Sequence, residues 1–162
     1  MNSRPAIASD SPAIAAIYSA GILERVATFQ TEPRTPDDIL RWFQSALPKI
    51  VIEEDDRVVA FAAAFPYSDR CCYAGVGEFS VYVAPDFRHR GAGRLAMDAL
   101  IEASAAFGLH KLVSRVFPEN EASLGLLKSV GFREVGVHEK HGRLDGVWRD
   151  VVVVERLIPE NL

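Results

Sequence analysis

The spacing of apolar residues along this chain switches between the two-residue period of a strand and the longer period of a helix. Gly77–Ala84 alternates strictly, with Glu78, Ser80 and Tyr82 on one face and apolar residues on the other, which predicts a strand between two different environments. Shortly after it, Gly91–Phe107 carries apolar residues every three or four positions with charged residues between them. This is the pattern of a long amphipathic helix with one side in the core.

The remaining elements follow from the same two periods together with capping and turn residues. Further strands are expected at Arg4–Ala8, Ile50–Glu54, Val58–Phe65, Lys111–Phe117, Phe132–His138 and Val147–Arg156. Further helices are expected to begin at Ser9 or Asp10, at Thr35, and at Glu119 or Asn120. The mixed order of strands and helices, without linkers or repeats, predicts one α/β or α+β domain over residues 1–162.

Composition and charge narrow the class of protein. The 162 residues are 49% apolar and 25% charged, as in ordinary folded domains, and the net charge is −4. A negative chain is a poor match for a phosphate backbone, so we expect no nucleic-acid partner. The longest apolar run, Val58–Phe65, is far shorter than the ~20 residues of a membrane span, so we expect no membrane partner either.

The first ten residues and the cysteines bear on the cellular compartment. Met1–Asp10 lacks the layout of a signal peptide. Cys71 and Cys72 are adjacent, and on a strand their side chains would point to opposite faces, so a disulfide between them is not expected. Reduced cysteines without a leader predict a cytoplasmic protein.

The segment between the central strand and the long helix has the features of an anion site. Arg88–Arg90 precedes Gly91 and Gly93, and the helix that follows offers unpaired N–H groups at its positive end, which suits a pyrophosphate. Two alternatives are a glycine-rich turn with solvated arginines and a dinucleotide-binding turn of the GxGxxA type. The second is disfavoured, because its acidic partner belongs roughly 20 positions on, whereas Glu119 lies about 28 positions on.

Four short motifs follow one another along most of the chain. They are Val81-Tyr82-Val83, Arg88-x-x-Gly91-x-Gly93, Asn120-x-x-Ser123 and Gly131-Phe132. In this order they resemble the GNAT superfamily of acyl-CoA-dependent N-acyltransferases. The resemblance implies the GNAT fold, a central mixed, mostly antiparallel sheet of about seven strands flanked by about four helices. It also implies acetyl-CoA as the co-substrate.

Longer segments carry a narrower resemblance, to the phosphinothricin acetyltransferase branch of that superfamily. They are Ala27–Pro33, Arg70 with Tyr73, and Glu78–Val83. Within the branch, Arg115–Asn120 and Leu144–Val151 are most like the arsenic-operon members, which are associated with acetylating arsinothricin, the arsenic analogue of phosphinothricin. The resemblance implies an N-acetyltransferase that acts on the α-amine of such glutamate analogues, in detoxification and antibiotic resistance.

The resemblance also implies roles for individual residues. Glu78 would be the general base that takes a proton from the amine during direct attack in a ternary complex. The backbone of Val81–Val83 would bond the pantetheine arm, His89–Arg94 would hold the pyrophosphate, and Asn120 would lie near the thioester. The residues expected to bind acetyl-CoA are Val81, Tyr82, Val83, Arg88, His89, Arg90, Gly91, Ala92, Gly93, Arg94, Asn120 and Ser123.

Three residues are expected on the substrate side. Arg70 would hold an anionic head group, Tyr73 would donate its hydroxyl to the same group, and Phe29 would wall the pocket. The alternatives are a solvated loop arginine, a tyrosine packed on a strand and a core aromatic. At Leu127 the chain departs from the tyrosine or histidine of its relatives, so water or the proton released by the ammonium is expected to protonate the leaving thiolate.

Other features leave alternatives open. His138 and His141 lack further ligands, which favours solvated loop histidines, and we expect no metal. Trp148 and Val151–Val154 are expected to form a buried strand, at a subunit contact of the homodimer that is common among similar enzymes. The alternative functions are acetylation of methionine sulfoximine or another amino-acid analogue, acetylation of protein N-termini, and a non-catalytic acyl-CoA-binding sensor.

Overall fold

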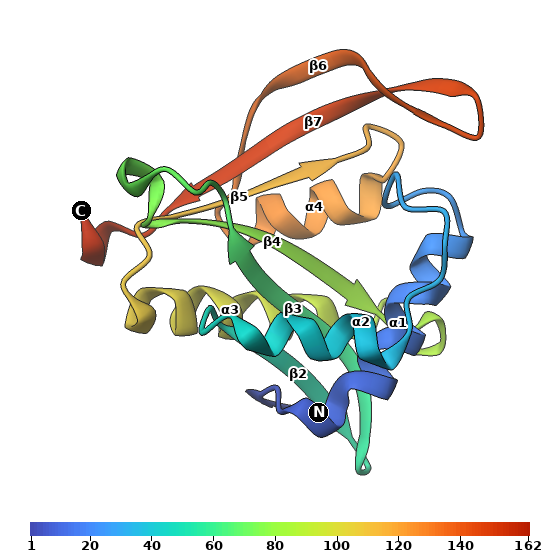
Figure 1. Cartoon of the computed structure of the whole chain (residues 1–162), viewed down its shortest axis with the longest axis vertical. Helices are drawn as coiled ribbons and strands as arrows, with labels where there is room; N and C mark the ends of the chain where they lie inside the picture. The colour runs from blue at the N-terminus through green and yellow to red at the C-terminus, as the bar shows by residue number, and fades with distance from the viewer.

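Seven strands form one sheet in the order β1-β2-β3-β4-β5-β7-β6, as the computed structural model of residues 1–162 shows (Figure 1). The strands are β1 (Asn2–Pro5), β2 (Lys49–Glu54), β3 (Arg57–Pro66), β4 (Val76–Val83), β5 (Lys111–Val116), β6 (Arg133–Leu144) and β7 (Val147–Leu157). All neighbours run antiparallel except β4 and β5, which are parallel, so the expected sheet is confirmed. β1 ends earlier than expected, because the Ile7 N–H donates to the Asp10 carboxylate and the chain turns there.

Four α-helices cover the two faces of this sheet. They are α1 (Ser11–Leu23), α2 (Pro36–Leu40), α3 (Ala92–Phe107) and α4 (Glu121–Ser129). α1 and α2 pack on one face around Phe61, whereas α3 and α4 pack on the other around Phe79. Thr35 and Asn120 cap α2 and α4 by accepting backbone hydrogen bonds, as their sequence positions predict. None of the helices combines the length and the apolar character needed to cross a bilayer.

β4 and β5 separate part-way along their length. Their pairing covers only Val76–Glu78 against Lys111–Val113, although β4 continues to Val83 and β5 to Val116. Beyond Glu78, one edge of β4 therefore has no strand beside it, while its other edge stays paired with β3. Such an edge leaves backbone N–H and C=O groups available to another extended chain.

The β6–β7 hairpin is longer than the sequence predicts. β6 continues to Leu144 because register shifts, one of them between His138 and Gly142, absorb residues that break the alternation. His138 and His141, which were expected in a loop, therefore lie on this strand with their ring centroids 4.3 Å apart. The expectation of loop histidines is wrong.

At two further places the local structure differs from what the sequence suggests. Cys71 and Cys72 lie exposed in a 3-10 turn, Cys71–Tyr73, and not on a strand; both thiols are free. Trp148 lies on β7 as expected but is 51% exposed; it pairs with Arg143 close to the turn of the hairpin. The valines that follow it on β7 are mostly buried within this chain, at Val151, Val152 and Val154.

Candidate active site

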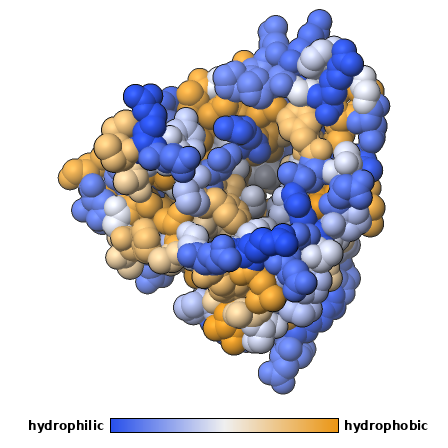
Figure 2. All heavy atoms as spheres, in the orientation of Figure 1, coloured by the Kyte–Doolittle hydropathy of each residue, from blue (hydrophilic) through white to orange (hydrophobic).

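Two cavities meet along the unpaired edge of β4. One, of about 510 Å³, lies beside Glu78 and the end of β5, and the other, of about 450 Å³, lies beside the start of α3. We call them the Glu78 cavity and the α3 cavity. They are parts of one groove, because the same residues line both: Ala27, Val81, Tyr82, Asn120 and Ser123. Figure 2 shows the face of the molecule that is turned to the viewer in Figure 1. This face is hollowed near its centre, with hydrophilic and hydrophobic residues around the opening.

The α3 cavity has the backbone of an anion site. Gly91, directly before α3, has φ +88°, and a Cβ built there would meet no atom within 4 Å. His89 is left-handed too, with φ +62°. This turn leads into a helix of 16 residues, whose first N–H groups lack partners inside the helix and lie at the positive end of its dipole. The predicted loop therefore lies where a phosphate could accept backbone hydrogen bonds.

The arginines around this loop differ in how closely the rest of the chain engages them. Arg88 and Arg94 form ion pairs with acidic neighbours at 2.8 and 3.6 Å. Arg90 lies over the ring of Phe87, 4.9 Å from its centroid. Arg90 is also the one residue of the predicted phosphate loop that does not line the cavity. Arg94 lines the cavity, is 59% exposed and lies too far from Asp98 for a direct hydrogen bond, so it joins the loop backbone and His89 as a donor open to a ligand.

The side chain of Tyr82 packs beneath α1. Its ring stacks on that of Tyr18 at 4.9 Å, and burial raises the pKa of its hydroxyl well above the ordinary range. Gly21 of α1 makes room for it, since a Cβ there would come 2.6 Å from Tyr82 Cε1. Val81 and Val83 pack against the core on the opposite face of the sheet. With their side chains engaged, these three residues chiefly offer backbone groups to the groove.

The Glu78 cavity combines one carboxylate, one guanidinium and an aromatic wall. Glu78 Oε1 lies 3.7 Å from Arg115 Nη1, and the side chains are 34% and 55% exposed. Phe29 packs edge-on against Phe117 with ring centroids 4.8 Å apart. Gly142 allows this contact, because a Cβ there would come 2.8 Å from the Phe29 ring. A carboxylate in this position can accept a proton from a bound amine.

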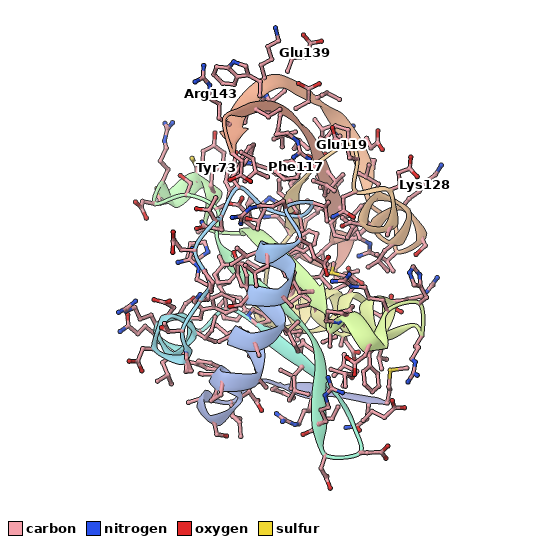
Figure 3. All side chains as sticks on the ribbon, turned by 90° about the vertical axis from the view of Figure 1, so that its right-hand side faces the viewer. Tyr73, Phe117, Glu119, Lys128, Glu139 and Arg143 are labelled. Atoms are coloured by element: carbon pink, nitrogen blue, oxygen red, sulfur yellow. The ribbon has the colours of Figure 1, made fainter.

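Arg70 and Tyr73 lie outside both cavities. The Arg70 guanidinium lies 5.9 Å from the Tyr73 ring centroid, in the turn between β3 and β4. Tyr73 lines a third cavity together with Tyr67, against which it packs edge-on. In Figure 3, Phe117 lies beneath the β6–β7 hairpin, whereas Tyr73 lies on the separate segment before β4. The structure thus leaves these two predicted substrate residues apart from Glu78.

Sequence reasoning missed two residues of the Glu78 cavity that can carry positive charge, Arg115 and His141. Arg115 stands near the end of a predicted strand, a common place for site residues, whereas His141 reaches the cavity only through the register shift in β6. Leu127, which also lines the cavity, is buried and offers no proton donor. The chain holds no group of three or more His, Cys, Asp or Glu side chains placed to share a metal ion.

Comparison with known proteins decides the family. The model of the acetyltransferase (GNAT) family matches residues 17–132, well over half of the chain. This chain belongs to the GNAT acetyltransferase family. The fold and the enzyme class expected from the motifs are therefore confirmed. The expected co-substrate, acetyl-CoA, is bound in a solved structure that shares this fold.

Curated relatives of this GNAT enzyme match it over nearly its full length. A phosphinothricin N-acetyltransferase of Streptomyces coelicolor is 34% identical over 160 residues, which cover 94% of both chains. An L-methionine sulfoximine/L-methionine sulfone acetyltransferase of Pseudomonas aeruginosa is 30% identical over 157 residues, covering 94% of this chain and 91% of the relative. The phosphinothricin acetyltransferase resemblance is thereby confirmed.

Solved structures share the whole fold of this GNAT enzyme. A ribosomal-protein-alanine N-acetyltransferase from Brucella melitensis has a TM-score of 0.93 at 28% identity, covering 98% of this chain and 100% of that one. The acetyltransferase yncA of Salmonella typhimurium, solved with its cofactor acetyl-CoA, has a TM-score of 0.93 at 27% identity, covering 97% and 93%. Because these structures cover nearly the whole of this chain, the strands and helices described above are shared with them.

Proposed function

We propose that this enzyme transfers the acetyl group of acetyl-CoA to the α-amine of a glutamate-like amino acid with an anionic tetrahedral head group. Arsinothricin is the first candidate and phosphinothricin the second. The observation that carries the proposal is the position of Glu78, a carboxylate in one cavity of a groove whose other cavity is lined by the predicted phosphate loop. The names of the Streptomyces and Pseudomonas relatives support amino-acid analogues as acceptors.

In this proposal, each part of acetyl-CoA lies against a particular segment of the groove. The pantetheine arm would lie along Val81–Val83, where β4 lacks a neighbouring strand and can bond an extended ligand. The pyrophosphate would lie at the start of α3 against the backbone of His89–Arg94. Asn120 and Ser123, which line both cavities, would contact the arm near the thioester.

The chemistry then needs few groups. Glu78 takes one proton from the ammonium, directly or through water. The neutral nitrogen attacks the thioester carbonyl carbon, so that a C–N bond forms and the C–S bond breaks, while a backbone N–H near Val81 stabilises the oxyanion. The second surplus proton of the nitrogen passes through water to the thiolate, because Leu127 offers no donor. The products are the amide, the free thiol and a proton on Glu78.

The role that follows is detoxification, since acetylation removes the ammonium charge by which an amino-acid analogue is recognised. Acetylation of methionine sulfoximine is the alternative that the Pseudomonas relative supports. A protein N-terminus is supported by the name of the Brucella structure. A non-catalytic acyl-CoA sensor is supported by Leu127, because this side chain offers no proton donor for a leaving thiolate. We place the enzyme in the cytoplasm, and its exposed free thiols support that placement.

The test is thiol release from acetyl-CoA with arsinothricin, phosphinothricin, methionine sulfoximine, glutamate and a short peptide. We expect kcat/KM for the first two to exceed that for glutamate about 10-fold or more, because the head group adds contacts that glutamate lacks. Preference for methionine sulfoximine or for the peptide would replace the proposed substrate. Acetyl-CoA binding without turnover of any amine would favour the sensor.

We further propose a homodimer formed through the β6–β7 hairpin. This hairpin forms the edge of the sheet and exposes the apolar side chains Val135, Val137, Val147 and Trp148. Sedimentation is expected to give twice the 17.8 kDa chain mass, and Trp148→Glu to lower it. A wild-type mass of one chain would contradict the proposal.

A further inference from the structure

Arg115 is the charged residue of the Glu78 cavity to which the chemistry above gives no role. We propose that its guanidinium binds the α-carboxylate of the acceptor while Glu78 faces the α-ammonium, so that the pair recognises the α-amino-acid group itself. The inference rests on the proposed function. It adds a substrate requirement, namely a free carboxylate on the carbon that carries the reacting amine.

Parallel pairing of β4 and β5 places the two charges side by side. Glu78 is opposite Val113, and Arg115, two residues beyond Val113, projects from the same face of β5. Ser114 turns to the other face, where its hydroxyl donates to the carbonyl oxygen of Phe79 at 2.9 Å. The strands separate beyond Glu78, so Arg115 stands where the sheet opens and a ligand can enter.

Arg115 is free to bind a ligand. Its Nη1 lies 3.7 Å from Glu78 Oε1, too far for a direct hydrogen bond, and its side chain is 55% exposed. Arg149, which the chain itself engages, is the contrast: its side chain is 18% exposed, pairs with Glu119 at 3.3 Å and lies over the ring of Phe117. Arg115 is the only lysine or arginine among the residues that line the Glu78 cavity.

The charges of Glu78 and Arg115 match those of a zwitterion. An α-amino acid carries its ammonium and its carboxylate on one carbon, so its two charges are close neighbours. A carboxylate and a guanidinium 3.7 Å apart can face these charges with opposite signs, and the guanidinium can hold both carboxylate oxygens. The rings of Phe29 and Phe117, which pack edge-on against each other, line the same cavity and give it an apolar wall.

The experiment compares acceptors with and without the α-carboxylate. L-phosphinothricin and L-methionine sulfone are each paired with their α-carboxamide, in which a neutral amide replaces the carboxylate. For the wild type, we expect kcat/KM to favour each acid over its amide roughly 10- to 100-fold, the effect of a hydrogen-bonded charge. In Arg115→Gln, we expect most of that preference to disappear through a higher KM for the acid, with the KM for acetyl-CoA unchanged.

Two matched variants separate this effect from a general loss of charge. Arg41→Gln removes an arginine that is paired with Asp38 outside the groove, and it is expected to keep the wild-type preference. His141→Asn removes the other side chain of the Glu78 cavity that can carry positive charge, and the preference is expected to survive there too.

The outcomes distinguish the inference from the function on which it rests. An acid preference that persists in Arg115→Gln would overturn the inference while the wild-type turnover upheld the function. If the preference is lost in His141→Asn but not in Arg115→Gln, the carboxylate binds at His141 and the inference is again overturned. If the wild type binds acetyl-CoA by calorimetry but acetylates neither acid, both the inference and the proposal of amino-acid acceptors are overturned.

Discussion

Replacing Glu78 with glutamine is expected to lower the turnover number roughly 10²-fold or more, the usual worth of a general base. Glutamine keeps the size of the side chain but can neither carry the charge nor accept the proton of the amine. Glu78 does not line the α3 cavity, so the affinity for acetyl-CoA, measured by calorimetry, is expected to stay at the wild-type value.

The defect of Glu78→Gln should also shrink as the pH rises. An α-amine loses its own proton near pH 8 or above, so that less of it then depends on a base. The comparison is turnover from about pH 6 to about pH 9 for wild type and variant, at saturating acetyl-CoA. Glu102→Gln, an exposed carboxylate on α3, is the control and should behave like the wild type. Near-wild-type turnover of Glu78→Gln over this range would remove Glu78 as the base.

Gly91→Val is expected to weaken acetyl-CoA binding on the order of 100-fold, because hydrogen bonds to charged groups contribute about 1.5–3 kcal/mol each. A β-branched residue is strained at φ +88°, and relief of that strain would turn the N–H groups before α3 away from a pyrophosphate. A side chain would also fill the open space beside Gly91 that a phosphate would otherwise approach. Calorimetric titration with acetyl-CoA measures the effect.

Gly108→Val is the matched control for Gly91→Val. Gly108 ends the same helix with φ +105°, and a Cβ there would likewise meet nothing within 4 Å. Both variants carry the same kind of backbone strain and should lose similar thermal stability, but only the one at the loop should lose affinity. Equal affinities for the two variants would refute the assignment of the phosphate loop.

The elements that could be predicted are those decided by neighbouring residues. The apolar spacing of Gly91–Phe107 is a local property, and α3 occupies nearly that range. Thr35 and Asn120 cap helices because their side chains bond the N–H three residues on, which again needs no distant partner. The same holds for the alternation of Gly77–Ala84, which reappears as the two faces of β4.

The contacts that could not be predicted join segments far apart in the chain. Arg115 meets Glu78 only through the register of β4 and β5, which no local pattern reveals. Phe29 reaches the hairpin only because Gly142 lacks a side chain at the point of contact. For Arg70, the family resemblance suggested a role in substrate binding but not a position. The turn between β3 and β4 determines where its side chain lies, next to Tyr73.

The separation of β4 from β5 links the stability of this protein against unfolding to the concentration of its co-substrate. The open edge of β4 exists only in the folded chain, so a co-substrate that bonds it binds the folded state in preference to the unfolded state. By mass action, a ligand at 100 times its dissociation constant shifts the folding equilibrium by about 2.7 kcal/mol. Resistance of the enzyme to unfolding and proteolysis would then rise and fall with the cell's supply of acetyl-CoA.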